Sequence, residues 1–186
     1  ARNLGIKRFV YSASSSAYGN ASIYPTPEDA PTDPLSPYGL QKQIGEQYCR
    51  VFHHCYGLES VSLRYFNVFG RKQDPNGPYA AVIPIFVSQL IRGQSPVING
   101  DGNYSRDFTY IDDVIQANLL SITSTNEKAI NTVYNVAYGD RNTLNDLVRY
   151  LKKYLSDFDS NISNIEVIYG PNRAGDIPHS HACIDK

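Results

Sequence analysis

A tyrosine and a lysine lie four positions apart in the segment from Ser36 to Lys42, which reads Ser-Pro-Tyr-Gly-Leu-Gln-Lys. Ser36 can cap a helix, and Pro37 suits its first turn. Tyr38 and Lys42 would then lie on one helical face, one turn apart. A neighbouring ammonium group favours the ionised form of a phenol, which lets a tyrosine exchange a proton near neutral pH. The spacing also occurs by chance in many helices, so this interpretation needs support from the rest of the chain.

Three consecutive serines follow the first apolar segment of the chain. Residues 8–12 are typical of a short buried strand. Ser14, Ser15 and Ser16 come shortly after it. Open α/β sheets place their chemistry at the carboxyl ends of such strands, so the serines are candidate active-site residues. A serine-rich turn without a function is the alternative interpretation.

Composition and charge exclude several classes of protein. The chain has 186 residues, of which 41% are hydrophobic and 19% are charged, an ordinary globular balance. A net charge of -1 gives no electrostatic reason to expect binding to nucleic acid or to an anionic membrane. No apolar run reaches the ~18 residues that a membrane-spanning helix needs. We therefore expect neither a nucleic acid nor a membrane as partner.

The three cysteines, Cys49, Cys55 and Cys183, form no C-x-x-C pair. An odd count without such a pair argues against a disulfide scaffold or a zinc site and fits the reducing environment of the cytoplasm. His53 and His54 precede Cys55, but adjacent histidines point in different directions on a helix, and no second ligand cluster lies nearby in the sequence. We therefore expect no metal.

Apolar patterns and turn residues predict an alternation of strands and helices. Strands are expected at 8–12, 60–67, 97–98, 106–111, 133–137 and 165–169. Helices are expected at 37–56, 80–92, 112–121 and 143–155, and a proline-rich loop at 20–37. This order predicts an α/β fold in which helices cross over between the strands of a parallel sheet.

The glycine-rich turn that binds a dinucleotide in many such folds is absent from this sequence. No G-x-G-x-x-G pattern follows a first strand. Gly100 and Gly102 come after the expected strand 97–98, but they lead into another strand and not into a helix. They therefore do not fit the dinucleotide fingerprint.

Five motifs occur in a fixed order along essentially the whole chain. They are Ser14-Ser15-Ser16-Ala17-Tyr18-Gly19, Tyr38-x-x-x-Lys42, Leu63-Arg64-Tyr65-Phe66-Asn67-Val68-Phe69-Gly70, Arg106-Asp107-Phe108-x-Tyr110-Ile111-Asp112-Asp113 and Arg173-x-Gly175-Asp176. Together they resemble the extended short-chain dehydrogenase/reductases that modify nucleotide sugars, the NAD-dependent epimerase/dehydratase family. Within that family the sequence is most similar to UDP-N-acetylglucosamine 4-epimerases.

The resemblance implies the C-terminal part of a doubly wound parallel-sheet (Rossmann) domain and a smaller mixed α/β substrate domain. Residues 1–70 and 105–125 would belong to the NAD-binding domain, and residues 71–104 and 126–186 to the substrate domain. Members of the family commonly pair through a four-helix bundle. Helix 37–56 would contribute to it, so a homodimer is expected.

The family normally opens with the glycine-rich turn that this sequence lacks. The sequence also begins Ala1-Arg2-Asn3 instead of with methionine. We therefore expect that the first third of the protein precedes Ala1 and that a short piece follows Lys186. The pyrophosphate-binding turn for NAD would then lie outside this sequence.

The resemblance also assigns catalytic roles. Tyr38 would take the proton from the sugar 4-hydroxyl while NAD receives a hydride from C4. Lys42 would assist the phenolate and hydrogen-bond the nicotinamide ribose, and Ser14 would hydrogen-bond the 4-oxygen. Dehydratases and decarboxylases of this fold tend to carry carboxylates beside that serine. This chain has Ser15 and Ser16 there, which favours epimerisation over elimination.

Further residues match positions that bind cofactor and substrate in the family. Tyr65 and Val68 would contact the nicotinamide end of NAD. Arg106 and Arg173 would hold the diphosphate of a UDP-sugar, because a guanidinium group matches phosphate geometry. The remaining substrate contacts are expected from Asn67, Ala81, Val82, Tyr104, Asp176 and Ser180.

Ser180 bears on the choice of sugar. Relatives restricted to UDP-glucose and UDP-galactose often have a tyrosine there, and a small residue leaves room for a 2-acetamido group. We therefore expect UDP-GlcNAc and UDP-GalNAc as substrates, without exclusion of the plain UDP-hexoses. Two alternatives remain. One is another enzyme of the fold, such as a UDP-uronate epimerase, a decarboxylase or a dehydratase, and the other is a non-catalytic nucleotide-sugar-binding relative.

Overall fold

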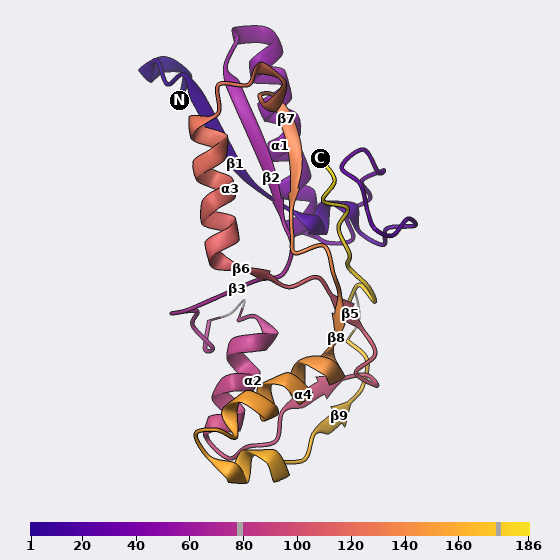
Figure 1. Cartoon of the computed structure of the whole chain (residues 1–186). Helices are drawn as coiled ribbons and strands as arrows, with labels where there is room; N and C mark the ends of the chain where they lie inside the picture. Colours follow the sequence, from indigo (N-terminus) through magenta and orange to yellow (C-terminus); the bar gives the residue numbers. More distant parts are fainter. Residues whose placement is uncertain (78–79, 174–175) are drawn as a thin grey trace.

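The computed structural model describes residues 1–77, 80–173 and 176–186. In Figure 1 the molecule is elongated, with a parallel sheet and long helices in its upper part and shorter helices in its lower part. The chain passes from the upper to the lower part after the second strand of the sheet, and its C-terminal segment returns to the upper part. The junction between the parts is therefore formed by segments that are far apart in the sequence.

The upper part is built on a sheet of three parallel strands, flanked by helices α1 and α3 (Figure 1). In spatial order the strands are β1 (Arg8–Ser14), β2 (Glu59–Tyr65) and β7 (Thr132–Val136). The helices are α1 (Pro37–Tyr56) and α3 (Ile111–Thr123), and short 3-10 turns lie at Arg2–Leu4, Ser15–Tyr18 and Glu127–Ala129. The α/β class and the parallel sheet predicted from the sequence are confirmed.

Strand β2 lies at the centre of this sheet, and its side chains alternate between the two faces. Val61 and Leu63 pack with Val114 of α3 and form the apolar core of the upper part. Arg64 points to the other face, where it reaches Glu46 of α1. One face of the sheet is thus apolar, and the other carries a buried ion pair.

Helix α1 begins and ends where the sequence predicts. The Oγ of Ser36 accepts a hydrogen bond from the backbone N–H of Gly39 (3.0 Å), and Pro37 occupies the first turn. Gly57 ends the helix in the left-handed conformation (φ 68°), which a residue without a Cβ adopts at little cost. Tyr38 therefore lies in the first turn of α1.

The lower part contains two helices, two pairs of short strands and a 3-10 turn (Figure 1). The helices are α2 (Val82–Ile91) and α4 (Leu144–Leu155), and the turn lies at Ser160–Asn164. The strand pairs are β4 (Val97–Asn99) with β9 (Ile168–Gly170), and β5 (Ser105–Arg106) with β8 (Asn142–Thr143). The core of this part consists of Phe86, Ile98, Leu147 and Val148. It is separate from the core beside the sheet, which explains the two-part shape.

One further pair of short strands lies between the two parts. Strand β3 (Val68–Phe69) pairs in parallel with β6 (Thr109–Tyr110).

Helix α4 begins with a predicted cap. The Oγ1 of Thr143 accepts a hydrogen bond from the N–H of Asp146 (3.0 Å), and the Asp146 carboxylate accepts one from the N–H of Thr143 (3.2 Å). This reciprocal capping box confirms the predicted start of α4.

One expected domain boundary is corrected by strand β7. Residues 126–186 were expected in the substrate domain, but Thr132–Val136 pairs with β2 in the sheet of the upper part. The parallel register runs from Val61 with Thr132 to Tyr65 with Val136. The backbone of β2 needs hydrogen-bond partners along both edges. Strand β1 supplies them along one edge and β7 along the other.

Three element boundaries also differ from those expected. The strand expected at 106–111 is two short strands, β5 and β6, because Asp107 leaves the ladder to bind backbone groups elsewhere. Helix α3 begins after Tyr110 and has no side-chain cap, and Asp112 lies in its first turn, where a negative charge is favourable. The last strand, β9, is shorter than expected, because the O of Ile165 accepts a hydrogen bond from Lys152 Nζ (2.8 Å) and not from a strand.

Asp107 is fully buried (0% exposed) and joins three chain segments at the junction. Its carboxylate accepts hydrogen bonds from the backbone N–H groups of Tyr138 (3.0 Å), Gly139 (3.2 Å) and Ala182 (3.1 Å). Burial raises the pKa of Asp107 above its ordinary value, and these three donors oppose that shift. The carboxylate thereby holds the turn after β7 and the C-terminal segment against the end of β5.

Replacing Asp107 with alanine should lower the free energy of unfolding by about 3 kcal/mol, because buried N–H groups lose their acceptor. Asp107→Asn should cost less, because its amide keeps one acceptor oxygen. Denaturant titration followed by circular dichroism measures the loss. The matched control is Asp140→Ala, since Asp140 lies in the same turn but is exposed. Equal losses for the two alanine variants would contradict this role of Asp107.

Candidate active site

A cavity of about 510 Å³ lies at the carboxyl ends of β1 and β2, where the upper part meets the lower part. We call it the first cavity. The predicted site residues that line it are Ser14, Ser15, Ser16, Tyr38, Lys42, Tyr65, Asn67, Val68, Arg106, Asp176 and Ser180. The structure therefore brings together residues that the motifs had placed only in sequence order.

A second cavity of about 400 Å³ lies in the lower part and shares a wall with the first. The predicted residues Ala81, Val82, Tyr104 and Arg173 line this second cavity and not the first. The residues that line both are Asn67, Val68, Arg106 and Asp176. An elongated ligand could therefore place one end in each cavity, and its middle would then lie beside Arg106.

Ser14 is the last residue of β1 and is buried (9% exposed). Its Oγ accepts hydrogen bonds from the backbone N–H (3.2 Å) and from the hydroxyl (2.9 Å) of Ser16. A hydroxyl oxygen has two acceptor positions and one proton. Since both acceptor positions are used, the group that Ser14 can offer to a ligand is its proton.

Tyr38 and Lys42 lie on one face of α1 and together line one side of the first cavity. The Nζ of Lys42 lies 5.6 Å from the ring centroid of Tyr38 and donates a hydrogen bond to the backbone O of Ser12 (2.8 Å). Tyr38 itself is half exposed (52%). The contact with β1 thus holds the ammonium group between the serine strand and the phenol.

Arg106 lies where the two cavities meet. Its Nη1 donates hydrogen bonds to the backbone O of Ser105 (3.0 Å) and of Pro178 (3.1 Å). Burial lowers the pKa of Arg106 from its ordinary value, and the charge of Asp176 opposes that shift. A guanidinium group remains protonated under such conditions. A partly desolvated cation in this wall is suited to a phosphate group.

Asn67 and Ser180 contact each other in the wall of the first cavity. The Nδ2 of Asn67 donates hydrogen bonds to the Oγ of Ser180 (2.9 Å) and to the backbone O of Asp107 (3.0 Å). The N–H of Ser180 donates in turn to the O of Ser105 (3.1 Å). The C-terminal segment is therefore bound directly to the end of β2, and Ser180 is held at a fixed place beside the cavity.

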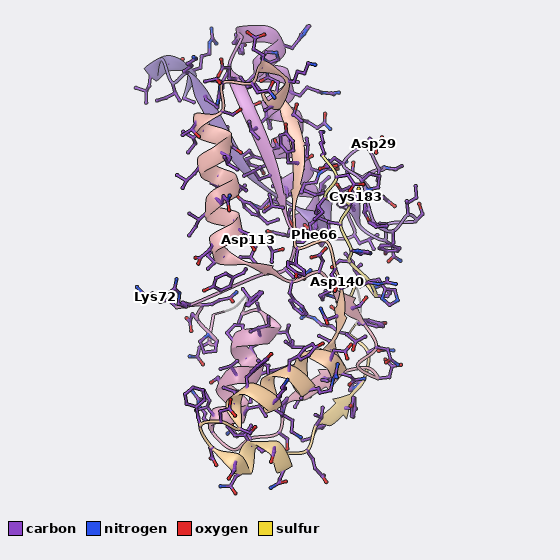
Figure 2. All side chains as sticks on the ribbon, viewed as in Figure 1. Asp29, Phe66, Lys72, Asp113, Asp140 and Cys183 are labelled. Carbon is purple, nitrogen blue, oxygen red and sulfur yellow. The ribbon has the colours of Figure 1, made fainter. Side chains whose placement is uncertain are left out.

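Phe66 is one of the residues that line the first cavity. Figure 2 shows it at the junction between the upper and lower parts. Its side chain is buried (2% exposed), packs with Ala182, and lies 6.2 Å from the ring of Tyr18 between centroids. Phe66 is therefore a buried apolar part of the cavity wall.

The sequence motifs missed one wall of the first cavity, which Tyr24, Thr26 and His179 form. The Oη of Tyr24 donates a hydrogen bond to the O of His179 (3.1 Å), and their rings meet edge to face at 6.5 Å. Thr26 pairs with Ala182 in a parallel bridge. Tyr24 and His179 are 155 positions apart, and no local pattern signals such a contact. The one signal in the sequence for this wall is that Tyr24, an aromatic residue, lies in the proline-rich loop.

Among residues 1–77, 80–173 and 176–186, no group of three or more His, Cys, Asp or Glu residues is placed to hold a metal ion. None of the helices in this part of the chain combines the length and apolar character that crossing a membrane requires.

The residues expected at the nicotinamide end of NAD lie together in the first cavity. Tyr65 and Val68 face the same space as Tyr38 and Lys42. An ammonium group has three protons, and the contact with Ser12 uses one, so Lys42 keeps donors for the hydroxyls of a ribose. This donor set fits the nicotinamide ribose of NAD.

The motifs and the site geometry agree with a family assignment. The model of the NAD dependent epimerase/dehydratase family matches residues 1–137, and the chain belongs to this family. The family's cofactor is NAD, in keeping with the donor set described above.

Within this family, the chain is similar to proteins that are named as UDP-sugar 4-epimerases. A solved structure of a UDP-N-acetylglucosamine 4-epimerase from Methanobrevibacter ruminantium, in complex with UDP-N-acetylmuramic acid, is 45% identical with a TM-score of 0.88 and covers 99% of this chain and 56% of that one. A UDP-glucose 4-epimerase of Thermotoga maritima with UDP-glucose is 38% identical with a TM-score of 0.89, covering 98% and 56%. A protein of Methanocaldococcus jannaschii, named provisionally as a UDP-glucose 4-epimerase, is 38% identical over 100% of this chain and 57% of its own length.

The names of these relatives, and the share of their length that this chain covers, both bear on function. These proteins are named as UDP-sugar 4-epimerases, and other matching relatives are UDP-glucuronate 4-epimerases. The chain spans about half the length of the relatives it matches, 57% and 56% in the first of them.

Replacing Arg106 with methionine should weaken the binding of UDP about 10- to 100-fold, because a charge-assisted hydrogen bond to the diphosphate is lost. Isothermal titration calorimetry of the full-length protein with UDP measures the change. Arg92→Met is the matched control, since Arg92 is an exposed arginine at the end of α2. Unchanged UDP affinity in Arg106→Met would contradict the phosphate-binding role.

Proposed function

We propose that the protein containing this chain is an NAD-dependent 4-epimerase of UDP-hexoses, with UDP-GlcNAc and UDP-GalNAc as its principal substrates. The observation that carries the proposal is that Ser14, Tyr38 and Lys42 line one cavity, which shares Arg106 with the second. Proton-transfer groups thus lie at one end of a site whose other end is suited to a nucleotide diphosphate. The names of the relatives support the same reaction.

The chemistry of C4 epimerisation needs a proton acceptor, a hydrogen-bond donor to the 4-oxygen and a hydride acceptor. NAD, when bound, supplies the last of these. Tyr38 accepts the proton of the 4-hydroxyl and returns it at the end of the cycle. Ser14 offers its proton to the 4-oxygen, and the Lys42 ammonium stabilises the negative charge on the Tyr38 phenolate.

The residues beside Ser14 favour epimerisation over the other reactions of the fold. Ser15 and Ser16 line the first cavity, and neither has a carboxylate. Elimination of water from the sugar requires a base for the C5 proton, which a hydroxyl group near neutral pH does not provide. A UDP-uronate 4-epimerase remains the second candidate, since relatives with that name also match. A non-catalytic binding protein is disfavoured, because binding alone does not require a paired phenol and ammonium.

The two parts of the molecule have different roles in this proposal. The upper part would bind NAD. The lower part would bind the uridine end of the substrate through Ala81, Val82 and Tyr104.

The proposal includes assembly and location. Helix α1 exposes a stripe of apolar side chains, and this stripe supports a homodimer formed through a helix bundle. The stripe consists of Leu40, Ile44, Tyr48 and Val51. The cysteines are free, which fits a cytoplasmic location.

Tyr38→Phe in the full-length protein should lower kcat for UDP-GlcNAc about 100- to 10,000-fold, since proton transfer by a positioned side chain contributes that much. Chromatographic separation of UDP-GlcNAc from UDP-GalNAc after incubation with NAD measures it. Tyr154→Phe is the control, because Tyr154 is exposed (61%) on α4. Turnover by Tyr38→Phe at the wild-type rate would exclude the proposed role. A dehydrated or decarboxylated product from the wild-type protein would exclude the proposed reaction.

Ser180→Tyr should reduce kcat/KM for UDP-GlcNAc relative to UDP-glucose about 10- to 200-fold, the range that a change of pocket size usually supplies. A tyrosine here fills space beside Asn67 in the wall of the first cavity. Ser180→Ala is the control, because it removes the hydrogen bond to Asn67 without filling the space. Equal substrate ratios in Ser180→Tyr and wild type would show that Ser180 does not select the sugar.

A further inference from the structure

A buried ion pair lies behind the first cavity, on the face of the sheet that α1 covers. Arg64 of β2 and Glu46 of α1 are 5% and 7% exposed. The Nε and Nη2 of Arg64 donate to the two carboxylate oxygens of Glu46 at 2.9 and 2.7 Å. The Nη1 of Arg64 donates to the backbone O of Glu28 (3.0 Å). The guanidinium group therefore joins the sheet, α1 and the proline-rich loop.

The same guanidinium group holds the turn that carries the serines. Its central carbon lies 4.5 Å from the ring centroid of Tyr18, in the 3-10 turn that follows Ser14. Burial raises the pKa of Tyr18 above its ordinary value, so the phenol stays neutral and keeps its proton. The Oη of Tyr18 donates that proton to the Oδ1 of Asn135 (2.7 Å).

Asn135 extends these contacts to the proline-rich loop and to the C-terminal segment. Its Nδ2 donates to the backbone O of Thr26 (2.9 Å) and of Cys183 (3.0 Å). Its N–H donates to a carboxylate oxygen of Glu28 (3.0 Å). The proline-rich loop and the C-terminal segment are thereby tied to β7.

One continuous polar network thus joins β2, α1, the serine turn, the proline-rich loop and the C-terminal segment, which all contribute to the walls of the first cavity. Glu46 lies one helical turn beyond Lys42 on α1, and Tyr18 lies four residues after Ser14. Arg64 itself is absent from the cavity lining, as is Glu46. Any influence of Arg64 on a bound sugar must therefore pass through the segments that it holds.

We propose that Arg64 is a positioning residue that sets the placement of Tyr38 and Lys42 relative to Ser14, acting through Glu46 on α1 and through Tyr18 beside the serines. The kinetic test of this inference rests on the proposed function, because it measures turnover of a UDP-sugar. A guanidinium group makes several directed contacts at fixed angles, so it can fix both segments at once. Lysine lacks that geometry, and apolar side chains can fill the space without imposing it.

Stability and positioning can be separated by replacing both partners of the pair. Removing one partner leaves an unpaired buried charge and endangers folding, whereas apolar replacement of both is often neutral for stability. Arg64→Met with Glu46→Leu in the full-length protein should therefore keep the thermal midpoint within about 5 °C of wild type. Its kcat should fall about 10- to 100-fold, the effect of a small misplacement of reacting groups. KM for the UDP-sugar should change less than about threefold, since the nucleotide contacts remain.

The chain offers a matched control at the opposite end of the sheet. Arg8 of β1 pairs with Glu59 of β2 at 3.0 Å, far from the cavity in strand register. Arg8→Met with Glu59→Leu makes the same chemical change. It should leave kcat at the wild-type value. Arg64→Lys is the third variant, because it keeps the charge, and it should show a smaller loss of kcat than the double variant.

The outcomes separate the inference from the proposed function. Wild-type kcat in a folded Arg64→Met, Glu46→Leu variant would overturn the positioning role. If that variant does not fold, wild-type kcat in Arg64→Lys overturns it instead. A second readout does not need turnover: 3-fluorotyrosine at position 38 reports its surroundings by ¹⁹F NMR. Its resonance should move in the Arg64 variants and not in the Arg8 control, and an unmoved resonance overturns the inference even if wild type proves inactive on UDP-sugars.

Discussion

The parallel pairing of β1 with β2 is the constraint on which the rest of the site depends. Its register places Ser14 beside Tyr65, so both strands end at the same edge of the sheet. The serine turn and the segment that carries Asn67 therefore leave the sheet side by side. A shift of one residue in this register would turn Arg64 towards α3 and Leu63 towards α1. The apolar core and the buried ion pair together exclude that shift.

The remaining walls of the site are attached to this edge by polar contacts that are buried. Asp107 binds the turn after β7 and the C-terminal segment through backbone N–H groups. Asn67 binds Ser180 directly. Such contacts are directional, and an unpaired buried donor is costly, so each wall has one favoured position. These hydrogen bonds consequently contribute to the shape of the first cavity.

Much of the local structure was predictable from the sequence because its causes are local. Ser36, Gly57 and Thr143 act on backbone groups within one helical turn, and all three end or begin helices as expected. The alternation of strand and helix patterns predicted the fold class, and the motifs predicted many, but not all, of the residues that line the two cavities. The contact between Tyr24 and His179 was not predictable, and neither was the pairing of β7 with β2. Both depend on which distant segment reaches a given place, and neither residue type nor spacing records that.

The repeated passage of the chain between the upper and lower parts has an evolutionary consequence. In the sequence, the segments of the lower part are interrupted by α3 and by β7, which lie in the upper part, and the C-terminal segment pairs with the loop at Thr26. No single cut in the sequence separates one part from the other. Exchange of the lower part as a cassette would require several simultaneous crossovers. In this architecture we therefore expect ligand preference to change by single substitutions in the cavity walls and not by recombination of whole domains.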